Sequence, residues 1–176
     1  MQALKERRST KSFKSDPIPM EILSNLLWAG YGINRPDSGK RTAPSALNSQ
    51  NIDIYVCMDK GVYLYEAKTH SLKLTLKEDI RNLIAGPQDY PRNAPIHLLY
   101  VADLSKLARI PNAQERLVFS ACNMAMICQN VELFCASSGL GAVTRGTMDI
   151  PSLREKLKLK EDQVLILNQI IGYAKE

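Results

Sequence analysis

The sequence predicts one α+β domain. Helical periodicity dominates the beginning of the chain, strands and helices then follow in a mixed order, and a very long apolar helix stands in the second half. A doubly wound fold would instead alternate strand and helix regularly. The 176 residues, 45% of them hydrophobic and 23% charged, fit a single domain spanning 1–176.

Two helices are predicted near the N-terminus. The charged segment 1–8 favours a short helix, and Pro17 and Pro19 interrupt regular structure after it. Over 20–31 apolar residues recur at helical spacing, which predicts a second helix. Residues 32–43 are rich in turn formers and have no apolar period, so a loop is expected there.

The middle of the chain has the pattern of an antiparallel meander. Alternating apolar residues predict a strand over 52–58, closed by a turn at 59–61 and followed by strands at 62–66 and 72–76. A modest helix is predicted over 77–85, because Gly86-Pro87 would end it. The continuous apolar run 95–102 predicts a buried strand.

The longest predicted helix spans about 113–138 and is apolar on nearly all sides. A helix of this kind must be covered all round, so we expect a second subunit to supply part of the cover. Polar residues such as Asn123 and Glu132 interrupt the apolar run, and we therefore expect no membrane span. A strand over 142–147, a helix over 150–159 and a final strand over 164–172 complete the prediction.

The net charge of +5 is concentrated at one end of the chain. Residues 1–14 hold five cations against Glu6 alone, which leaves only +1 for the rest. A nucleic-acid-binding module remains the alternative interpretation, but no aromatic residues interleave with the basic ones to stack on bases. The concentration of positive charge in residues 1–14 favours a local anion site, and we therefore expect no nucleic acid as partner.

The four cysteines form no C-x-x-C pair, and three of them fall in the long apolar helix. This spacing favours core packing over a zinc knuckle or a redox pair. A reducing compartment, the cytoplasm, is expected. The basic N-terminal segment leads into polar residues, so it is not predicted to be a signal peptide, and a leader removed before Met1 would leave no trace.

Arg7, Arg8, Ser9 and Lys11 form the first candidate site. Two guanidinium groups, a hydroxyl and an ammonium group within five residues offer the donors that a phosphate monoester needs. The same residues could also form a merely solvated basic segment.

Two further motifs are candidates. In the segment 43–50, Pro44 fixes the backbone, Ser45 and Ala46 allow a flat ligand to approach, and Asn48 offers an amide; the alternative is a short helix capped by Ser45. Gly139-Leu140-Gly141 follows the long helix, where the first glycine is typical of a helix C-cap. No metal-ligand cluster or Walker A sequence is recognisable.

Taken in order, these three elements resemble the nitroreductase family of flavoproteins. Arg7-Arg8-Ser9-Thr10-Lys11-Ser12-Phe13 is similar to the family's R-R-S-x-R-x-F opening, and residues 43–50 are similar to its A-P-S-x-x-N-x-Q turn. Residues 139–142 resemble its G-L-G step, and Ile171-Gly172-Tyr173 resembles its terminal strand. The resemblance covers essentially the whole chain.

The resemblance implies an α+β fold with a central, mostly antiparallel sheet flanked by helices, in an intertwined homodimer that binds FMN at the subunit interface. By position, Arg7, Arg8, Ser9 and Lys11 would hold the phosphate and ribityl chain. The partner subunit would contribute Pro44, Ser45, Ala46 and Asn48, while Leu140 and Gly141 would approach the flavin ring or its tail.

The resemblance also implies a ping-pong reaction, in which NAD(P)H delivers a hydride to FMN and leaves before an electron-poor acceptor such as a nitroaromatic or a quinone takes the electrons. The cofactor carries this chemistry, and no protein acid or base is strictly needed. A flavin-binding protein without turnover is the alternative within the same fold. Many members of the family have a proline after the Gly-Tyr pair and then a basic residue that reaches the phosphate, whereas this chain has Ala174-Lys175-Glu176. Lys175 is the terminal candidate for this phosphate contact, and Arg145 is the candidate to substitute for it.

Overall fold

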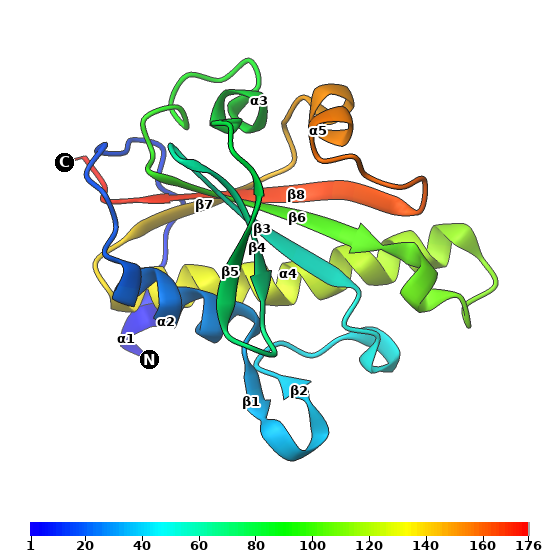
Figure 1. Cartoon of the computed structure of the whole chain (residues 1–176). Coiled ribbons are helices and arrows are strands. Elements are labelled where there is room, and N and C mark those ends of the chain that lie inside the picture. The colour runs from blue at the N-terminus through cyan, green and yellow to red at the C-terminus, as the bar shows by residue number, and fades with distance from the viewer. Residues whose placement is uncertain (176) are drawn as a thin grey trace.

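The computed structural model describes residues 1–175 and confirms the α+β fold, with a six-stranded sheet between two groups of helices (Figure 1). The strand order is β5-β4-β3-β6-β8-β7, and every neighbouring pair is antiparallel. The strands are β3 (Ile52–Met58), β4 (Gly61–Glu66), β5 (Ser71–Leu76), β6 (Ile96–Asp103), β7 (Gly141–Arg145) and β8 (Gln163–Gly172).

The helices cover the two faces of the sheet. One face carries α2 (Met20–Tyr31) and α4 (Ala113–Ser137), and the other carries α3 (Arg81–Ala85) and α5 (Ile150–Lys156), as Figure 1 shows. The short α1 (Gln2–Glu6) lies beside α4. Short 3₁₀ turns occur at Pro36–Ser38, Ala46–Asn48 and Leu104–Leu107.

Alternation along the central strands divides the core into two layers. On β6, Leu98 and Tyr100 face α2 and α4, whereas Leu99 and Val101 pack toward α3 and α5. All four side chains are fully buried, so β6 is the centre of both layers. The continuous apolar run that predicted this strand reflects burial on both of its faces.

Several predicted elements have different bounds in the structure. Residues 32–43 are not a plain loop, because β1 (Ile33–Arg35) and β2 (Lys40–Arg41) pair in a small hairpin that projects from the domain (Figure 1). The predicted helix over 77–85 begins only at Arg81, since the Asp79 carboxylate accepts the Arg81 N–H at 3.0 Å and forms a turn there. The predicted helix over 150–159 ends at Lys156, and the strand predicted over 142–147 is Gly141–Arg145.

Helix α4 is long and apolar enough to cross a membrane by length and composition alone. One of its faces, however, packs onto the sheet through side chains such as Met124, Ile127 and Val131, which are fully buried. The same helix carries two buried polar residues, Ser120 and Asn123, that hydrogen-bond to Asn51. These contacts identify α4 as the core helix of the domain.

Candidate functional site

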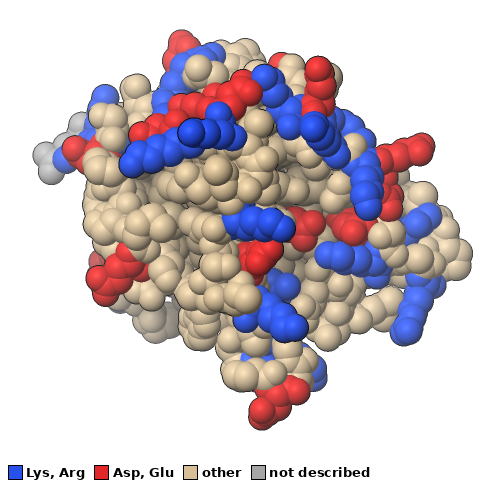
Figure 2. Space-filling model, viewed as in Figure 1, with Lys and Arg blue, Asp and Glu red and all other residues tan. Residues whose placement is uncertain are grey.

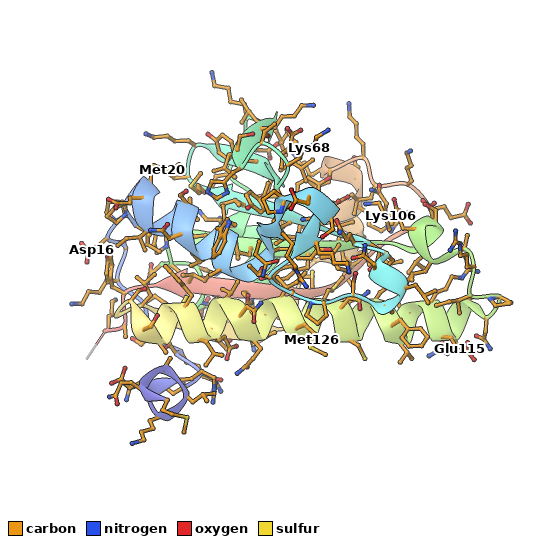
Figure 3. The ribbon with its side chains drawn as sticks, turned by 90° about the horizontal axis from the view of Figure 1, so that it is seen from below. Asp16, Met20, Lys68, Lys106, Glu115 and Met126 are labelled. Carbon is orange, nitrogen blue, oxygen red and sulfur yellow. The ribbon has the colours of Figure 1, made fainter. Side chains whose placement is uncertain are left out.

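The basic N-terminal segment lies at the C-terminal end of α4 and the beginning of β7. Figure 3 shows α1 beside the half of α4 that is far from Glu115. After α1, Ser9 forms a parallel β-bridge with Ala142, and the Thr10 N–H donates to the Ala142 carbonyl at 2.9 Å. Because β7 is the edge strand of the sheet, the segment is held there by backbone hydrogen bonds.

A pocket of about 520 Å³ opens between α1, the end of α4 and the turn into β7. This volume is within the range of small-molecule and cofactor sites. Its polar walls include the cations of Arg7 and Arg8 and the carboxylate of Glu132. The full set of lining residues is Lys5, Glu6, Arg7, Arg8, Thr10, Glu132, Ala136, Gly139, Leu140, Gly141, Ala142 and Ala174.

The floor of this pocket is the Gly139–Ala142 turn. Gly139 has a left-handed φ of +69°, and the Leu140 N–H reaches back to the Cys135 carbonyl at 2.9 Å, which ends α4 with a glycine C-cap. Gly141 serves a different purpose, since the side chain of Thr10 occupies the space that a Cβ would need. The C-cap interpretation of Gly139 is therefore correct, and the turn also lines the pocket.

The segment 44–50 forms a strained turn at a different place. Leu47, Asn48 and Gln50 all have left-handed φ angles of 54°, 51° and 44°. Such conformations cost about 1–3 kcal/mol each for residues other than glycine and persist where surrounding contacts enforce them. Ser45 does not act as a side-chain helix cap, because its Oγ accepts the Gln50 N–H at 3.0 Å and closes the turn.

Two external contacts hold the strained turn. The Asn123 Oδ1 of α4 accepts the Ala46 N–H at 2.9 Å, and the Arg41 guanidinium donates to the Gln50 side chain at 2.9 Å. Arg41 also stacks 4.0 Å above the ring of Tyr31. The turn is thus fixed to α2 and α4, with the side chains of Leu47 and Asn48 exposed.

One chain does not bring the turn and the pocket together. Asn123, which holds the turn, and Glu132, which lines the pocket, are nine residues apart on α4, about 14 Å along the helix axis. The free face of α4 carries exposed apolar side chains, among them Val118, Phe119 and Met126. Figure 3 shows Met126 on the side of α4 that faces away from the sheet.

The two candidates for a replacement phosphate contact lie in different surroundings. Arg145 does not line the pocket: only 6% of it is exposed, and its guanidinium donates to the Ile84 and Ala85 carbonyls at 3.1 and 2.9 Å. Burial lowers the pKa of Arg145. The backbone of Lys175, in contrast, is tied to Ser12 by a 3.0 Å hydrogen bond next to the pocket residue Ala174.

Comparisons with known proteins identify the family of the chain. The sequence model of the Nitroreductase family matches residues 4–173. The chain belongs to the Nitroreductase family. It is 31% identical over 171 residues to a nitroreductase-family protein of Methanocaldococcus jannaschii, a match that covers 92% of this chain and 85% of the relative.

Solved structures share the fold. A nitroreductase-family protein from Ralstonia eutropha JMP134 is 38% identical to this chain with a TM-score of 0.90, and the match covers 100% of this chain and 83% of that one. The NADPH:FMN oxidoreductase from Vibrio harveyi, solved in complex with NAD⁺, is 23% identical with a TM-score of 0.71, covering 99% and 68% of the two chains. The domain is accordingly a nitroreductase-type oxidoreductase fold.

Sequence reasoning missed three polar residues that shape the candidate site of this nitroreductase-family protein. Thr10 packs on Gly141, Asn123 holds the strained turn, and Glu132 forms an ion pair with Arg7 at 3.0 Å. In the sequence, Asn123 and Glu132 are recognisable only as polar interruptions of an apolar helix. This pattern indicates buried polar contacts, but it does not indicate which residues are their partners.

Proposed function

We propose that this protein is an FMN-dependent oxidoreductase that takes electrons from NAD(P)H and passes them to an electron-poor small molecule such as a nitroaromatic or a quinone. The observation that carries the proposal is the pocket in which Arg7 and Arg8 meet the Gly139–Ala142 turn. FMN fits this lining, because Arg7 and Arg8 offer charged donors for its phosphate and the small residues of the turn allow the ligand to approach the backbone.

The donor set supports a phosphate ligand. Arg7 and Arg8 line the pocket and present guanidinium groups that can bind phosphate oxygens in pairs. Ser9 and Lys11 stand on the same segment but are not among the residues that line the pocket. Lys175 can add a cation from the C-terminal side. Arg145 would have to leave four hydrogen-bond acceptors to reach the pocket, so we assign it to the support of α3.

A bound flavin would supply the hydride chemistry, and the residues of this chain would bind and orient it. Leu140 and Gly141 leave room for a flat or extended ligand above the turn. Charge-assisted hydrogen bonds from the N-terminal segment would fix the phosphate and therefore the position of the attached ring.

We further propose that the working unit is a homodimer. Pro44, Ser45, Ala46 and Asn48 lie on the strained turn, which is remote from the pocket within one chain. A second copy packed on the exposed apolar face of α4 would cover Phe119 and Met126 and bring its turn to this pocket. This arrangement explains why such a turn is held rigid at the surface.

The face of the molecule in Figure 2 gives the nucleic-acid alternative no support. On the face in Figure 2, basic and acidic side chains alternate and do not gather into a basic stripe.

The free cysteines Cys57, Cys128 and Cys135 are buried and unpaired, in keeping with a reducing compartment such as the cytoplasm.

The decisive experiment is to titrate the purified protein with FMN and to record its visible spectrum and flavin fluorescence. We expect a yellow complex with quenched fluorescence that is bleached by NADH or NADPH under anaerobic conditions and recovers its colour when a nitroaromatic or quinone is added. A protein that binds no FMN would refute the proposal. Binding without bleaching by either nicotinamide would identify a flavin carrier instead of an enzyme.

The same titration tests the homodimer. Light scattering during the experiment should give twice the 19.7 kDa mass of the chain. A monomeric protein that binds FMN with full affinity would contradict the two-subunit site, while leaving the flavin assignment in place.

A further inference from the structure

A chain of hydrogen bonds runs from the buried sheet to the proposed flavin pocket. The Tyr100 hydroxyl donates to the Gln169 side-chain carbonyl, and the Gln169 amide donates to Thr144 Oγ1 at 2.9 Å. Thr144 Oγ1 then donates to Glu132 Oε1 at 2.6 Å. Four elements, β6, β8, β7 and α4, thus contribute to one polar chain that ends at the Glu132 carboxylate.

The direction of every hydrogen bond in this chain is defined. Tyr100 and Gln169 are completely buried, and the second amide hydrogen of Gln169 donates to the Cys128 carbonyl at 3.0 Å. With both amide hydrogens of Gln169 donated, the Thr144 hydroxyl hydrogen is left for Glu132. A fully satisfied buried network of this kind fixes its members in one arrangement.

At the pocket end, the second oxygen of Glu132 accepts from Arg7 Nη1 at 3.0 Å. The side chain of Glu132 is 10% exposed and that of Arg7 is 34% exposed, so the carboxylate lies deeper than the guanidinium that it binds. Arg7 has five N–H donors and uses one on Glu132, which leaves the others for a ligand.

We infer that Glu132 is a positioning residue: anchored by Thr144, it holds the Arg7 guanidinium at the pocket, where the remaining donors bind the flavin phosphate. This inference rests on the proposed function. Arg7 stands on a short segment after α1, a five-residue helix with no buried residue, so little else fixes its side chain. Because Glu132 already orders the Arg7 side chain in the free protein, FMN binding causes little further loss of conformational entropy at Arg7.

A competing effect has the opposite sign. Glu132 is an anion beside the pocket and would repel a phosphate if its charge were not balanced. If repulsion dominated, removal of the carboxylate charge would tighten FMN binding, whereas loss of positioning would weaken it. The two interpretations therefore predict opposite changes in affinity.

The test compares FMN with riboflavin, which lacks the phosphate. We expect the wild-type protein to bind FMN more tightly than riboflavin in fluorescence titrations, and Glu132→Gln to reduce this preference about tenfold. Thr144→Val leaves all charges in place but removes the anchor of Glu132, and it should reduce the preference in the same direction. Glu115→Gln, at the exposed start of α4, is the matched control and should not change the preference.

General loss of structure would weaken FMN and riboflavin equally, so the ratio separates positioning from destabilisation. A double-mutant cycle of Arg7→Ala with Glu132→Gln should show that the second substitution adds little once Arg7 is absent. An unchanged ratio in Glu132→Gln, or tighter FMN binding, would overturn the inference while the flavin assignment stood. Failure of the wild-type protein to bind FMN would instead remove the proposed function itself.

Discussion

Gly141 lies so close to the side chain of Thr10 that residue 141 has no space for a side chain of its own. A Cβ placed on Gly141 would stand 2.6 Å from Thr10 Oγ1 and 2.8 Å from Thr10 Cβ. Thr10 cannot retreat freely, because its N–H is bonded to the carbonyl of Ala142. The glycine thus allows the basic segment to lie against β7 and form one wall of the pocket.

Gly141→Ala should therefore destabilise the protein by about 1–3 kcal/mol, the usual cost of overpacking, and weaken FMN binding through displacement of the basic segment. Chemical denaturation and FMN titration measure the two effects. Gly146→Ala is the matched control, since its added methyl group would have its nearest neighbour at 3.8 Å. Addition of Thr10→Gly to Gly141→Ala should restore FMN affinity, and equal losses in both glycine variants would contradict the steric explanation.

The order of elements could be predicted from the sequence because the core segments carry strong apolar periods. The predicted bounds 20–31 and 52–58 agree with α2 and β3, and the long helix differs from α4 by one residue. The errors fall where local contacts decide. The Asp79 carboxylate delays the start of α3, and the reversal at Lys158 ends α5 early without a glycine in the sequence to indicate it.

The candidate site was predictable in part from the order of its motifs along the chain. Arg7, Arg8, Leu140 and Gly141 come together in the pocket, as the order of motifs indicated. The role of Arg145 was not predictable, since only the fold shows that α3 offers it backbone carbonyls. Pairings between distant segments depend on the tertiary structure, which a single sequence does not display.

Asn123→Ala should cost about 2–4 kcal/mol of stability. Its Nδ2 donates to Asn51 Oδ1 at 2.8 Å and its Oδ1 accepts from Ala46. The substitution leaves the Ala46 N–H without a partner, at about 1–3 kcal/mol, and leaves Asn51 Oδ1 with only the long 3.4 Å hydrogen bond from Ser49 Oγ, which adds about 1 kcal/mol. Asn130→Ala is the matched control on the same helix. Its single contact, to the Gly30 carbonyl, is 3.5 Å long, and we expect a loss below about 1 kcal/mol. Urea denaturation measures both, and similar losses would argue against the proposed role of Asn123.

Lys158→Gly should stabilise the protein by about 0.5–1 kcal/mol. Lys158 has a left-handed φ of 51° at the end of α5, where Leu159 N–H bonds back to the Arg154 carbonyl. Glycine adopts this conformation without steric cost, although its greater freedom in the unfolded chain offsets part of the gain. Lys158→Ala removes the same charge but keeps the strain, so thermal denaturation should show no gain for it. A gain of equal size in both variants would point to the charge as the cause.

Arg8→Ala should weaken FMN binding at least tenfold and leave riboflavin binding nearly unchanged. The guanidinium lines the pocket and can donate two hydrogen bonds to a phosphate, which riboflavin does not have. Lys40→Ala, an exposed cation on the projecting hairpin, serves as the control for a general change in charge. Fluorescence titration at two salt concentrations checks the result. Equal weakening by both variants would indicate a long-range electrostatic effect and not a contact with phosphate.

His97 should make stability depend on pH in the acid range. Burial lowers the pKa of this completely buried side chain to about 3, and its Nε2 is bonded to the Pro91 carbonyl at 2.9 Å. An unfolded histidine has a pKa of about 6.5, so between these values the unfolded chain binds one proton more than the folded chain. The contribution of His97 to stability is therefore complete above about pH 6.5 and is lost as the pH falls, by about 1.4 kcal/mol per unit.

His97→Gln keeps a donor for the Pro91 carbonyl but cannot be protonated in this range. Its free energy of unfolding should fall less steeply than that of the wild-type protein between pH 6.5 and 4.5, because the acidic groups that the two proteins share cancel in the comparison. Urea denaturation at several pH values measures the difference. If the free energies of unfolding of the two proteins changed in parallel with pH, His97 would take up its proton in the folded state without cost. That result would contradict the effect expected from its complete burial.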